Sequence, residues 1–551
     1  MAVPGCVDHG HGAPARVWLS LIGLLVSVAL LGCSRGKPQE ASSITEPTAG
    51  RGGSLAYAVE ADPNGLDPTK NGWDPSGLLA AHAIFDPIAK FDADGQPRPY
   101  LAESWTHNDD YTEWTVKLRP GVRFHDGTPL DANAVLRFTK AIQESPITGP
   151  AAVYVSHSEK ITDLEVKTVM KRPWASYPVL LTGQGGFIAA PAQLDDPEGS
   201  IHPIGTGPFK VERWELGKRL VLQRNPDYWR EGLPYLDRVE FIPTGSLTDR
   251  VNGLLGGSFD VIHSSDPATN ERLDELAAEG SIKVYHDPGA TESNFVMFNT
   301  AVPPLDDLRV RKALAHATDR DQLLEVLGWP ADLRSDGPFR EGSMWFSAAA
   351  PPPYDRAAAR RLVEEYEAER GPIRVRLGTT DDPVNLKLTN ELARQWREAG
   401  VDVDVEAIDF KVFVIRAVAG QFEAVNFRYF GQPDPDGLWH FWTGETVRPV
   451  GQLSLNFSRL ADPAITDGMR RGRESPDLET RKQAYADVLG RFAELVPYVW
   501  FARTDWVIAT APRVHEPRSR TLPDGTPAMP YVAGVHDLTE TWIASRVVTG
   551  S

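Results

Sequence analysis

The stretch that decides the fold is LAESWTHNDDYTEWTVKLRPGVRFHDGTPLDANAVLRF, residues 101–138. Within it, WTVKL (114–118) alternates apolar and polar side chains, which predicts a β-strand. The Asp126-Gly127 pair that follows is typical of a tight turn. Residues 131–144 begin with an aspartate suited to cap a helix, and their apolar residues follow helical spacing. Strand, turn and helix in direct succession indicate an α/β protein.

The rest of the chain continues this alternation. Helices are predicted over residues 308–327, 354–368 and 383–399, and strands over residues 373–377 and 401–408. A chain of 551 residues is too long for one hydrophobic core, so two or three lobes are expected. Gly127, Gly205 and Gly207 are expected where a turn needs positive φ or where two backbones approach closely.

The N-terminal region predicts export and attachment to a lipid. Residues 17–32, VWLSLIGLLVSVALLG, follow Arg16 and are too few to span a bilayer core of about 30 Å as a permanent helix. The sequence LLGC ending at Cys33 resembles a bacterial lipoprotein signal, which implies removal of residues 1–32 and diacylation of Cys33. An ordinary signal peptide with a chance cysteine is the alternative. Residues 33–53 are polar and small, which predicts a flexible tether.

Composition excludes several classes of function. The net charge of −18 argues against nucleic acid binding, which needs clustered Lys and Arg. The two cysteines, Cys6 and Cys33, lie at or before the expected cleavage site, so the mature body has no thiol for a disulfide, a metal or catalysis. The histidines form no i, i+4 pair on a helix, and no metal site or cofactor is expected. The His-Glu-x-x-His and Gly-x-Ser-x-Gly motifs are absent, so no catalytic residue and no enzyme is predicted.

Four segments together identify a family. The first is residues 101–138, and the others are residues 203–229 with the turn GTGPF, residues 294–323, and residues 427–439 with the sequence FRYFGQPDPDGLW. In this order they resemble the extracytoplasmic solute-binding proteins of family 5, the substrate-binding lipoproteins of peptide, dipeptide and nickel ABC transporters.

The resemblance implies a two-lobed α/β fold of the periplasmic-binding-protein type II, class C, with an extra subdomain in the first lobe. Lobe I is expected over residues 54–287 with the subdomain at about 88–202, lobe II over 288–510, and a return to lobe I over 511–551. The chain would cross between the lobes near residues 287–292 and 505–515. Ligand would lie between the lobes, which close by a hinge motion.

The expected binding site departs from the family pattern at one position. In peptide-binding members, an acidic residue in the motif x-Gly-Asp-x-x-Asp-Pro meets the ligand ammonium. Alignment on Pro433-Asp434-Pro435 places Gly431 at that position, and a shift by one residue places Gln432 there. Neither carries a negative charge, while Asp434 between two prolines is typical of a turn. A ligand without an obligate ammonium is therefore favoured, unless Glu60 or Asp62 supplies the acid.

Aromatic and cationic side chains complete the predicted site, although about half of them are expected to be core residues. Aromatic rings supply broad apolar contact, and arginine can hold a carboxylate by two hydrogen bonds. The predicted ligand-binding residues are Glu60, Asp62, Asn294, Arg340, Trp345, Arg428, Tyr429, Phe430, Gly431, Gln432 and Trp439.

The leading hypothesis is a lipid-anchored protein that captures a peptide-like solute outside the cell and delivers it to a membrane permease. Its partners would be the permease and ATPase subunits of an ABC importer and, through the lipid, the outer face of the cell membrane, and it is expected to be a monomer. The same fold could instead bind a metal chelate, haem, a glycan or a lipid precursor, or act as a sensor. An exported hydrolase is the remaining alternative.

Overall fold

The computed structural model describes residues 49–286, 292–349, 351–429, 431–530 and 533–544. The predicted signal segment, Cys33 and most of the predicted tether lie outside the described residues, as do Phe430 and most of the first expected crossing. The described residues belong to one compact unit. Mixed sheets and helices alternate through this unit, so the predicted α/β class is confirmed.

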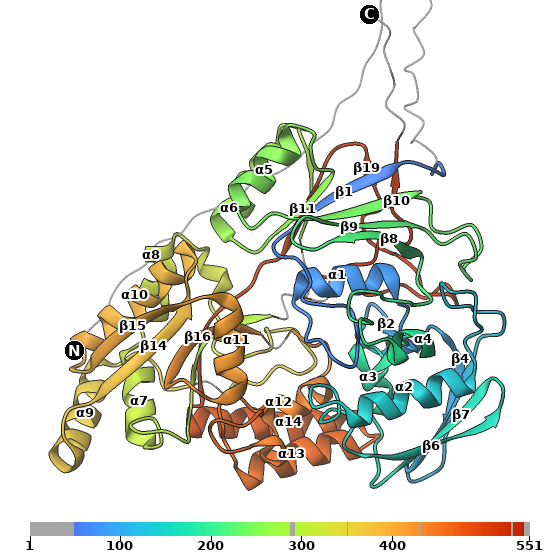
Figure 1. Ribbon diagram of the computed structural model, residues 1–551. Coiled ribbons are helices and arrows are strands. Elements are labelled where there is room, and N and C mark those ends of the chain that lie inside the picture. The colour runs from blue at the N-terminus through green and yellow to red at the C-terminus, as the bar shows by residue number, and fades with distance from the viewer. Residues whose placement is uncertain (1–48, 287–291, 350, 430, 531–532, 545–551) are drawn as a thin grey trace, which may run out of the picture. The chain divides into compact units, whose positions relative to one another are not determined.

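The first sheet has seven strands, and its central strand β1 pairs in parallel with both β10 and β11 (Figure 1). Helices α1, α5 and α6 contact β8, β11 and β12, respectively. In sheet order the strands are β12 (Lys283–His286), β18 (Val507–Thr510), β11 (Val261–Ser264), β1 (Ser54–Val59), β10 (Arg238–Pro243), β9 (Arg219–Arg224) and β8 (Phe209–Glu215), and the helices are α1 (Pro75–Ile84), α5 (Leu247–Leu255) and α6 (Pro267–Ala278).

Between α1 and β8 the chain leaves the first sheet and builds a smaller region around a four-stranded antiparallel sheet, which α2 covers. Asp131 caps α2 by accepting a hydrogen bond from the Ala134 N–H at 3.0 Å, as its position predicted. The elements are β2 (Ala89–Phe91), β3 (Pro97–Pro99), β4 (Ala102–His107), β5 (Glu113–Leu118), α2 (Ala132–Glu144), β6 (Val155–Thr162), β7 (Glu165–Met170), α3 (Tyr177–Leu180), η1 (Gln184–Gly186) and α4 (Pro191–Asp195).

Close backbone contact joins this region to the first sheet. A Cβ on Gly205 or Gly207 would lie within 2.1 or 2.5 Å of Ile84 backbone atoms, and the Gly207 N–H donates to the Ile84 carbonyl at 2.9 Å. Gly127 has φ +85°. The prediction that these three glycines serve close approach or positive φ is confirmed.

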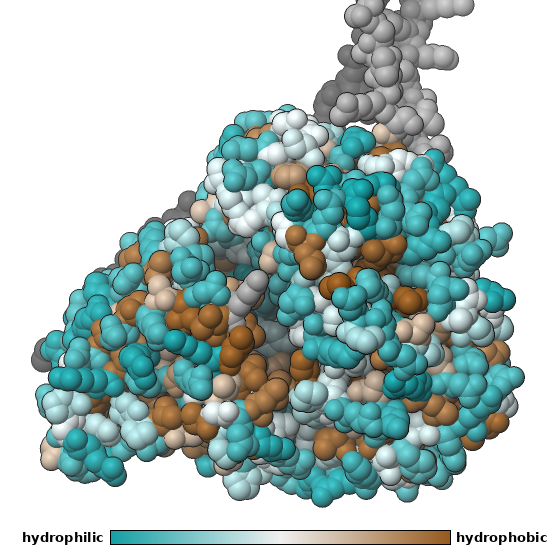
Figure 2. All heavy atoms as spheres, viewed as in Figure 1, coloured by the Kyte–Doolittle hydropathy of each residue, from teal (hydrophilic) through white to brown (hydrophobic). Residues whose placement is uncertain are grey.

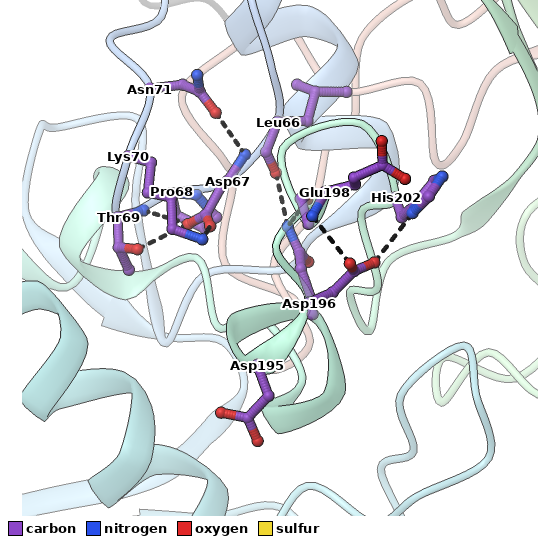
Figure 3. A network of polar contacts seen from close by, with 12 residues as sticks. Leu66, Asp67, Pro68, Thr69, Lys70, Asn71, Asp195, Asp196, Glu198 and His202 are labelled. Carbon is purple, nitrogen blue, oxygen red and sulfur yellow. Dashed lines mark hydrogen bonds and ion pairs between the residues drawn. The ribbon is translucent and has the colours of Figure 1, made fainter.

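The loop after β1 is held by hydrogen bonds within the loop and by hydrogen bonds to the segment around α4 (Figure 3). Asp67 accepts hydrogen bonds from the backbone N–H and hydroxyl of Thr69, which forms a local turn. The Gln193 side chain donates to the Leu66 carbonyl at 3.0 Å, and the Leu66 N–H donates to the Ser200 carbonyl. These contacts hold the segment that leads from β1 to α1.

The second sheet has five strands and helices on both faces (Figure 1). Helices α7 to α10 pack on one face, while α11, α13 and α14 pack on the other. In sheet order the strands are β15 (Asp402–Ile408), β14 (Arg374–Thr380), β16 (Ala424–Tyr429), β13 (Ser293–Phe298) and β17 (Tyr498–Arg503). The helices are α7 (Leu308–Ala317), α8 (Arg320–Leu327), η2 (Ala331–Leu333), α9 (Arg356–Arg370), α10 (Pro383–Glu398), α11 (Phe410–Ala419), η3 (Pro435–Leu438), α12 (Trp439–Trp442), η4 (Gly444–Thr446), α13 (Pro463–Glu474) and α14 (Leu478–Leu495).

The single helix predicted over residues 308–327 is two helices. Thr318 is extended, and its hydroxyl accepts a hydrogen bond from the Trp396 indole at 3.0 Å. Asp319 then caps α8 by accepting from the Gln322 N–H. Both helices face the same core, so the apolar spacing continues across the break. The spacing by itself therefore predicted one continuous helix.

The chain passes between the two sheets twice, after β12 and after β17. Since β18 pairs with β11 and β12, it belongs to the first sheet, and the last strand of the second sheet ends at Arg503. The C-terminal strands β19 (Val514–His515) and β20 (Trp542–Ile543) pair with each other. Asp537 forms a buried ion pair with Lys90 and so ties this segment to β2.

One electrostatic contact joins the two crossings. His286 ends β12, and Asp505 lies between β17 and β18. The His286 Nε2 is 2.9 Å from Asp274, and its Nδ1 is 3.3 Å from Asp505. The Asn270 side chain also donates to the Asp505 carbonyl at 2.7 Å. The hydrogen bonds to Asp505 and Asp274 raise the pKa of His286 to about 9.

A raised pKa makes this contact dependent on pH. Its contribution to stability is complete below about pH 6.5, the unfolded value, and is lost as the pH rises through about 9. We expect His286→Gln to lower the thermal midpoint by roughly 1 °C near pH 6, because half-exposed ion pairs are weak, and to have no effect near pH 10. Calorimetry across this range checks it, with His157→Gln as control because His157 bonds a serine hydroxyl. A difference independent of pH would contradict the role of the charge.

Candidate functional site

The carboxyl ends of parallel strands from both sheets mark the candidate site. In the first sheet, β1, β10 and β11 end at this edge, and the N-termini of α1, α5 and α6 follow them. In the second sheet, β14, β15 and β16 are parallel and end in the same way. Ligands of open α/β sheets bind outside the carboxyl ends of the strands. Figure 2 shows the surface hollowed between these two groups of elements.

Arg428 of β16 connects the two edges. Its Nη1 donates to the Ser265 hydroxyl after β11 at 2.6 Å, and its Nη2 lies 4.0 Å from Glu60 after β1. Its Nε lies 3.4 Å from Glu292, which precedes β13. The guanidinium also lies 4.9 Å from the centre of the Trp506 ring. An arginine of the second sheet is therefore held by groups of the first sheet.

Glu60 lies near two arginines and also near the acids Glu292 and Asp74. Arg250 of α5 lies 3.6 Å from its carboxylate, and the Glu60 N–H donates to Nε2 of His263 at 3.3 Å. Burial acts to raise the pKa of Glu60, but the positive charges of Arg428 and Arg250 outweigh burial and lower it. Glu60 is therefore a carboxylate that is already neutralised by two arginines.

Glu292 is the second acid of this cluster and is 6% exposed. It accepts a hydrogen bond from the Trp506 indole at 2.7 Å. Burial raises the pKa of Glu292, although Arg428 and the Trp506 hydrogen bond oppose this effect. Burial thus opposes the ionisation of this second acid, and Arg428 favours it.

Several buried polar atoms at this edge have no hydrogen-bond partner among the described residues: Nε and Nη1 of Arg250, Nδ1 of His263 and Oδ1 of Asn426. Burial lowers the pKa of His263 to about 3, so its ring is neutral. Since its Nε2 accepts from the Glu60 N–H, its Nδ1 carries the proton and is a donor. A buried polar atom without a partner costs about 1–3 kcal/mol. Nε and Nη1 of Arg250 and Nδ1 of His263 are donors and Oδ1 of Asn426 is an acceptor, so the edge offers mainly donors to a solute.

The other predicted residues lie in different surroundings. Asp62 accepts from the Trp214 indole at 3.2 Å and the Gly217 N–H at 2.6 Å, so it fixes the β8–β9 turn. Asn294 is opposite Arg428 in the sheet and donates to the Thr504 hydroxyl at 3.1 Å. Arg340 is exposed on the segment after η2.

The predicted aromatic residues contribute largely to the core. Trp345 is 4% exposed and donates to the Pro433 carbonyl at 2.9 Å, and Trp439 is fully buried. Tyr429 packs edge-to-face against Phe441. Gly431 is buried, and Gln432 is partly exposed beside Gly437.

The acids of the PDPDGLW segment have structural partners. Asp434 accepts from the Asp436 N–H and pairs with Arg481 at 2.8 Å, which agrees with its predicted turn role. Asp436 pairs with Arg473 at 2.6 Å and accepts from the Trp174 indole at 3.0 Å. All of these groups are at least largely buried, so neither aspartate is available for a ligand ammonium.

Sequence reasoning missed Arg250, His263 and Glu292. Arg250 and His263 belong to an ordinary helix and strand, and no local pattern distinguishes them from surface or core residues. The sequence offers one indication for Glu292: this acid stands directly before an apolar strand, at the expected first crossing between the lobes.

Comparison with known proteins agrees with the family resemblance of the sequence. Residues 96–448 match the family described as bacterial extracellular solute-binding proteins, family 5 Middle. The chain is 24% identical to the glutathione-binding protein GsiB of Pectobacterium atrosepticum and 26% identical to the nickel-binding periplasmic protein of Escherichia coli, in each case over 80% of this chain and 87% of the relative.

The solved structure of the periplasmic binding protein DppA of Helicobacter pylori, in complex with the peptide STSA, has a similar fold. It aligns with a TM-score of 0.77 at 21% identity, over 90% of this chain and 99% of that chain. The predicted two-lobed fold of type II is thereby confirmed.

The described residues contain neither a metal-binding cluster nor a membrane-spanning helix. No group of three or more His, Cys, Asp or Glu side chains is arranged to hold a metal ion. Within the same part of the chain, no helix has the length and apolar character required to cross a membrane.

The Asp436–Arg473 pair generates a stability prediction. We expect Asp436→Asn to lower the free energy of unfolding by about 3–5 kcal/mol, because it leaves the Arg473 charge buried without a counter-charge. Urea denaturation followed by tryptophan fluorescence measures this. The matched control is Asp487→Asn, which removes an exposed pair with Arg471 and should change stability by less than about 1 kcal/mol. Equal effects of the two variants would refute the structural role of Asp436.

Proposed function

This chain belongs to the bacterial extracellular solute-binding proteins of family 5, and we propose that it is the substrate-binding component of an ABC importer for a small peptide-like solute with a carboxylate group. The observation that carries the proposal is the position of Arg428, which belongs to the second sheet but contacts Ser265 and Glu60 at the edge of the first. A solute held there would contact both sheets at once.

The charges at the site favour a carboxylate. Nε and Nη1 of Arg250 are buried and have no partner among the described residues, and Arg428 approaches the Glu60 carboxylate oxygen that Arg250 does not. A solute carboxylate between the two arginines would accept charge-assisted hydrogen bonds from both. It would also satisfy donors that are otherwise buried without partners, which is a direct source of affinity.

A free ammonium on the solute is not required in this proposal. Gly431 has no charge where peptide-binding relatives are expected to carry an acid, and Asp434 is paired with Arg481. Asp62 is engaged by the β8–β9 turn, and Glu60 is neutralised by arginines. Burial of an unpaired ammonium is costly, so the site would select weakly for this group.

The mechanism is binding and closure without covalent chemistry. The solute would enter the hollow between the sheets, join the two edges through Arg428, and be delivered to a permease when the edges separate. A metal chelate is the second candidate ligand, because one relative is named as nickel-binding. A direct metal site is not favoured by the described residues, so a chelate would be recognised through its own carboxylates.

Calorimetric titration with S-methylglutathione and its derivatives tests the proposed solute class. We expect N-acetylation to change affinity by less than about threefold and amidation of both carboxylates to weaken it by at least about tenfold, since charge-assisted hydrogen bonds contribute about 1.5–3 kcal/mol each. Arg428→Met should weaken binding of the diacid by at least about tenfold, with Arg428→Lys intermediate. The control is Arg374→Met, which removes an arginine that is 81% exposed at the opposite end of β14.

Other results would contradict the proposal in distinct ways. Loss of binding on N-acetylation with retention on amidation would establish ammonium recognition. Binding of nickel–histidine without binding of any peptide derivative would establish the chelate function.

Attachment through Cys33 is the second part of the proposal. A lipid at Cys33, followed by the polar residues 34–53, would keep the binding unit close to its permease at the outer face of the membrane. Cys33→Ala should move the protein from the membrane fraction to the soluble fraction, because two acyl chains are sufficient for stable anchoring. Fractionation followed by immunoblotting measures the distribution, and continued membrane retention would refute the lipid anchor.

A further inference from the structure

The inserted region, residues 85–208 between α1 and β8, touches the helices of the second sheet. Ser176 precedes α3, and both its backbone N–H and its hydroxyl donate to the Arg473 carbonyl of α13 at 3.3 Å. The Tyr154 hydroxyl donates to Glu474, the last residue of α13, at 3.5 Å. Figure 1 shows α12 and α13 next to this region. The two halves of the molecule therefore meet at a second place besides the strand edges.

Aromatic rings fill this second contact. The Trp174 indole donates to Asp436 of η3 at 3.0 Å, and the Arg473 guanidinium lies 4.3 Å from the centre of the Trp174 ring. Tyr154 packs edge-to-face against Trp439 of α12, with 5.3 Å between the ring centres. Trp174 and Trp439 are fully buried, and all three rings belong to one hydrophobic cluster. Burial of large rings makes such a contact favourable and specific in geometry.

The inserted region is fixed to the first sheet. The Gly207 N–H donates to the Ile84 carbonyl at 2.9 Å, and the backbones approach too closely for a Cβ at Gly205 or Gly207. Lys90 of β2 also pairs with Asp537 of the C-terminal segment, which follows the first-sheet strand β18. The first sheet and the inserted region therefore form one lobe, and the second sheet with its helices forms the other.

The contact at Arg428 lies where the chain crosses between these lobes. Its Nε is 3.4 Å from Glu292, which precedes β13, and its guanidinium is 4.9 Å from the ring centre of Trp506, which precedes β18. Both residues belong to the segments that pass between the sheets. A hinge motion turns the lobes about these segments, so groups beside them shift least and groups across the hollow shift most.

The contact of the inserted region lies across the hollow from the first sheet. In the view shared by Figures 1 and 2, the hollow separates α12 and α13 from the strands around β11, where the crossings enter the first sheet. When the lobes separate about the crossings, Ser176 leaves Arg473 and Trp174 leaves Asp436. This contact therefore belongs to the closed arrangement alone.

We propose that Trp174, Tyr154 and Ser176 are positioning residues that hold the two lobes closed over the solute without touching it. This inference rests on the proposed function, because it assigns the contact that completes the closure proposed there. The chain leads from Arg428, at the carboxyl end of β16, to Asp436 in η3, which accepts the Trp174 indole. One short segment thus connects the residue that meets the solute with the contact that closes the lobes.

A closing contact changes affinity without changing selectivity. The apparent dissociation constant equals the intrinsic constant divided by the fraction of protein in the binding-competent form. Residues that stabilise the closed form therefore affect every solute by the same factor, whereas residues that touch the solute discriminate between solutes. This difference separates a closing role of Trp174, Tyr154 and Ser176 from direct recognition.

Ser176→Arg tests the assignment, because the hydrogen bond of the Ser176 hydroxyl crosses between the lobes and a long cation fits there only when Arg473 moves away. By small-angle X-ray scattering, we expect the solute-free variant to have a larger radius of gyration than wild type. By calorimetry, its binding of S-methylglutathione should be weaker by at least about tenfold. The ratio of affinities for S-methylglutathione and its diamide should stay within about twofold of the wild-type ratio.

The matched control is Ser156→Arg, the same substitution at an exposed serine of the inserted region whose hydroxyl contacts the neighbouring His157. It should change neither the radius of gyration nor the affinity. Trp174→Phe and Tyr154→Phe each keep a ring but remove one hydrogen bond to the second lobe. Each should weaken both probes by about threefold to tenfold. Thermal melting monitors folding, and these two variants take the place of Ser176→Arg in both measurements if it does not fold.

The outcomes separate this inference from the proposed function. Expansion of Ser176→Arg, with no binding of either probe to wild type, would support the closing contact and refute the proposed solute class. Equal radii of gyration for wild type, Ser176→Arg and Ser156→Arg would overturn the closing contact, whatever the probes show. Altered selectivity in Trp174→Phe or Tyr154→Phe would also overturn it, because the residue would then act on the solute directly.

Discussion

The contact of Arg428 with Glu60 and Ser265 is the interaction on which the organisation of this protein depends. Two sheets with separate helix layers are joined by only two chain crossings, so few covalent constraints fix one edge against the other. Charged groups at such a joint must be paired, because an isolated charge removed from water costs several kcal/mol. The same requirement supports the proposed binding site between the sheets, since the carboxylate of a solute could pair with Arg428.

The distribution of acids decides what kind of solute fits. Although the chain has a net charge of −18, the acids closest to the expected binding motif are engaged elsewhere: Asp434 with Arg481, Asp436 with Arg473, and Asp62 with a turn of the first sheet. The arginines at the edge are less completely paired, and Arg250 and Arg503 keep buried N–H groups without partners among the described residues. The net charge of the whole chain therefore does not set the charge that a solute would meet at this edge, because electrostatic interactions act at short range.

Much of the fold could be predicted from the sequence, because local patterns determine strands, turns and caps. The strand at 113–118, the helix capped by Asp131 and the close approach at Gly205 and Gly207 all follow from such patterns. The break at Thr318 was not predicted, because the apolar spacing continues across it into a core that both helices share. Of the residues predicted for the site, Glu60 and Arg428 lie together, whereas Trp345 and Trp439 pack in the core.

The sequence by itself determined the α/β class, the resemblance to a family, and the absence of an acid at Gly431. These properties depend on residue identity and on spacing along the chain, and both are visible in one dimension. Only the tertiary structure decided which charges meet: Arg250 with Glu60, Glu292 with Arg428, and Arg503 beside Ser293. Electrostatic energy depends on distance and burial, and residues separated by up to hundreds of positions acquire both only when the sheets have formed.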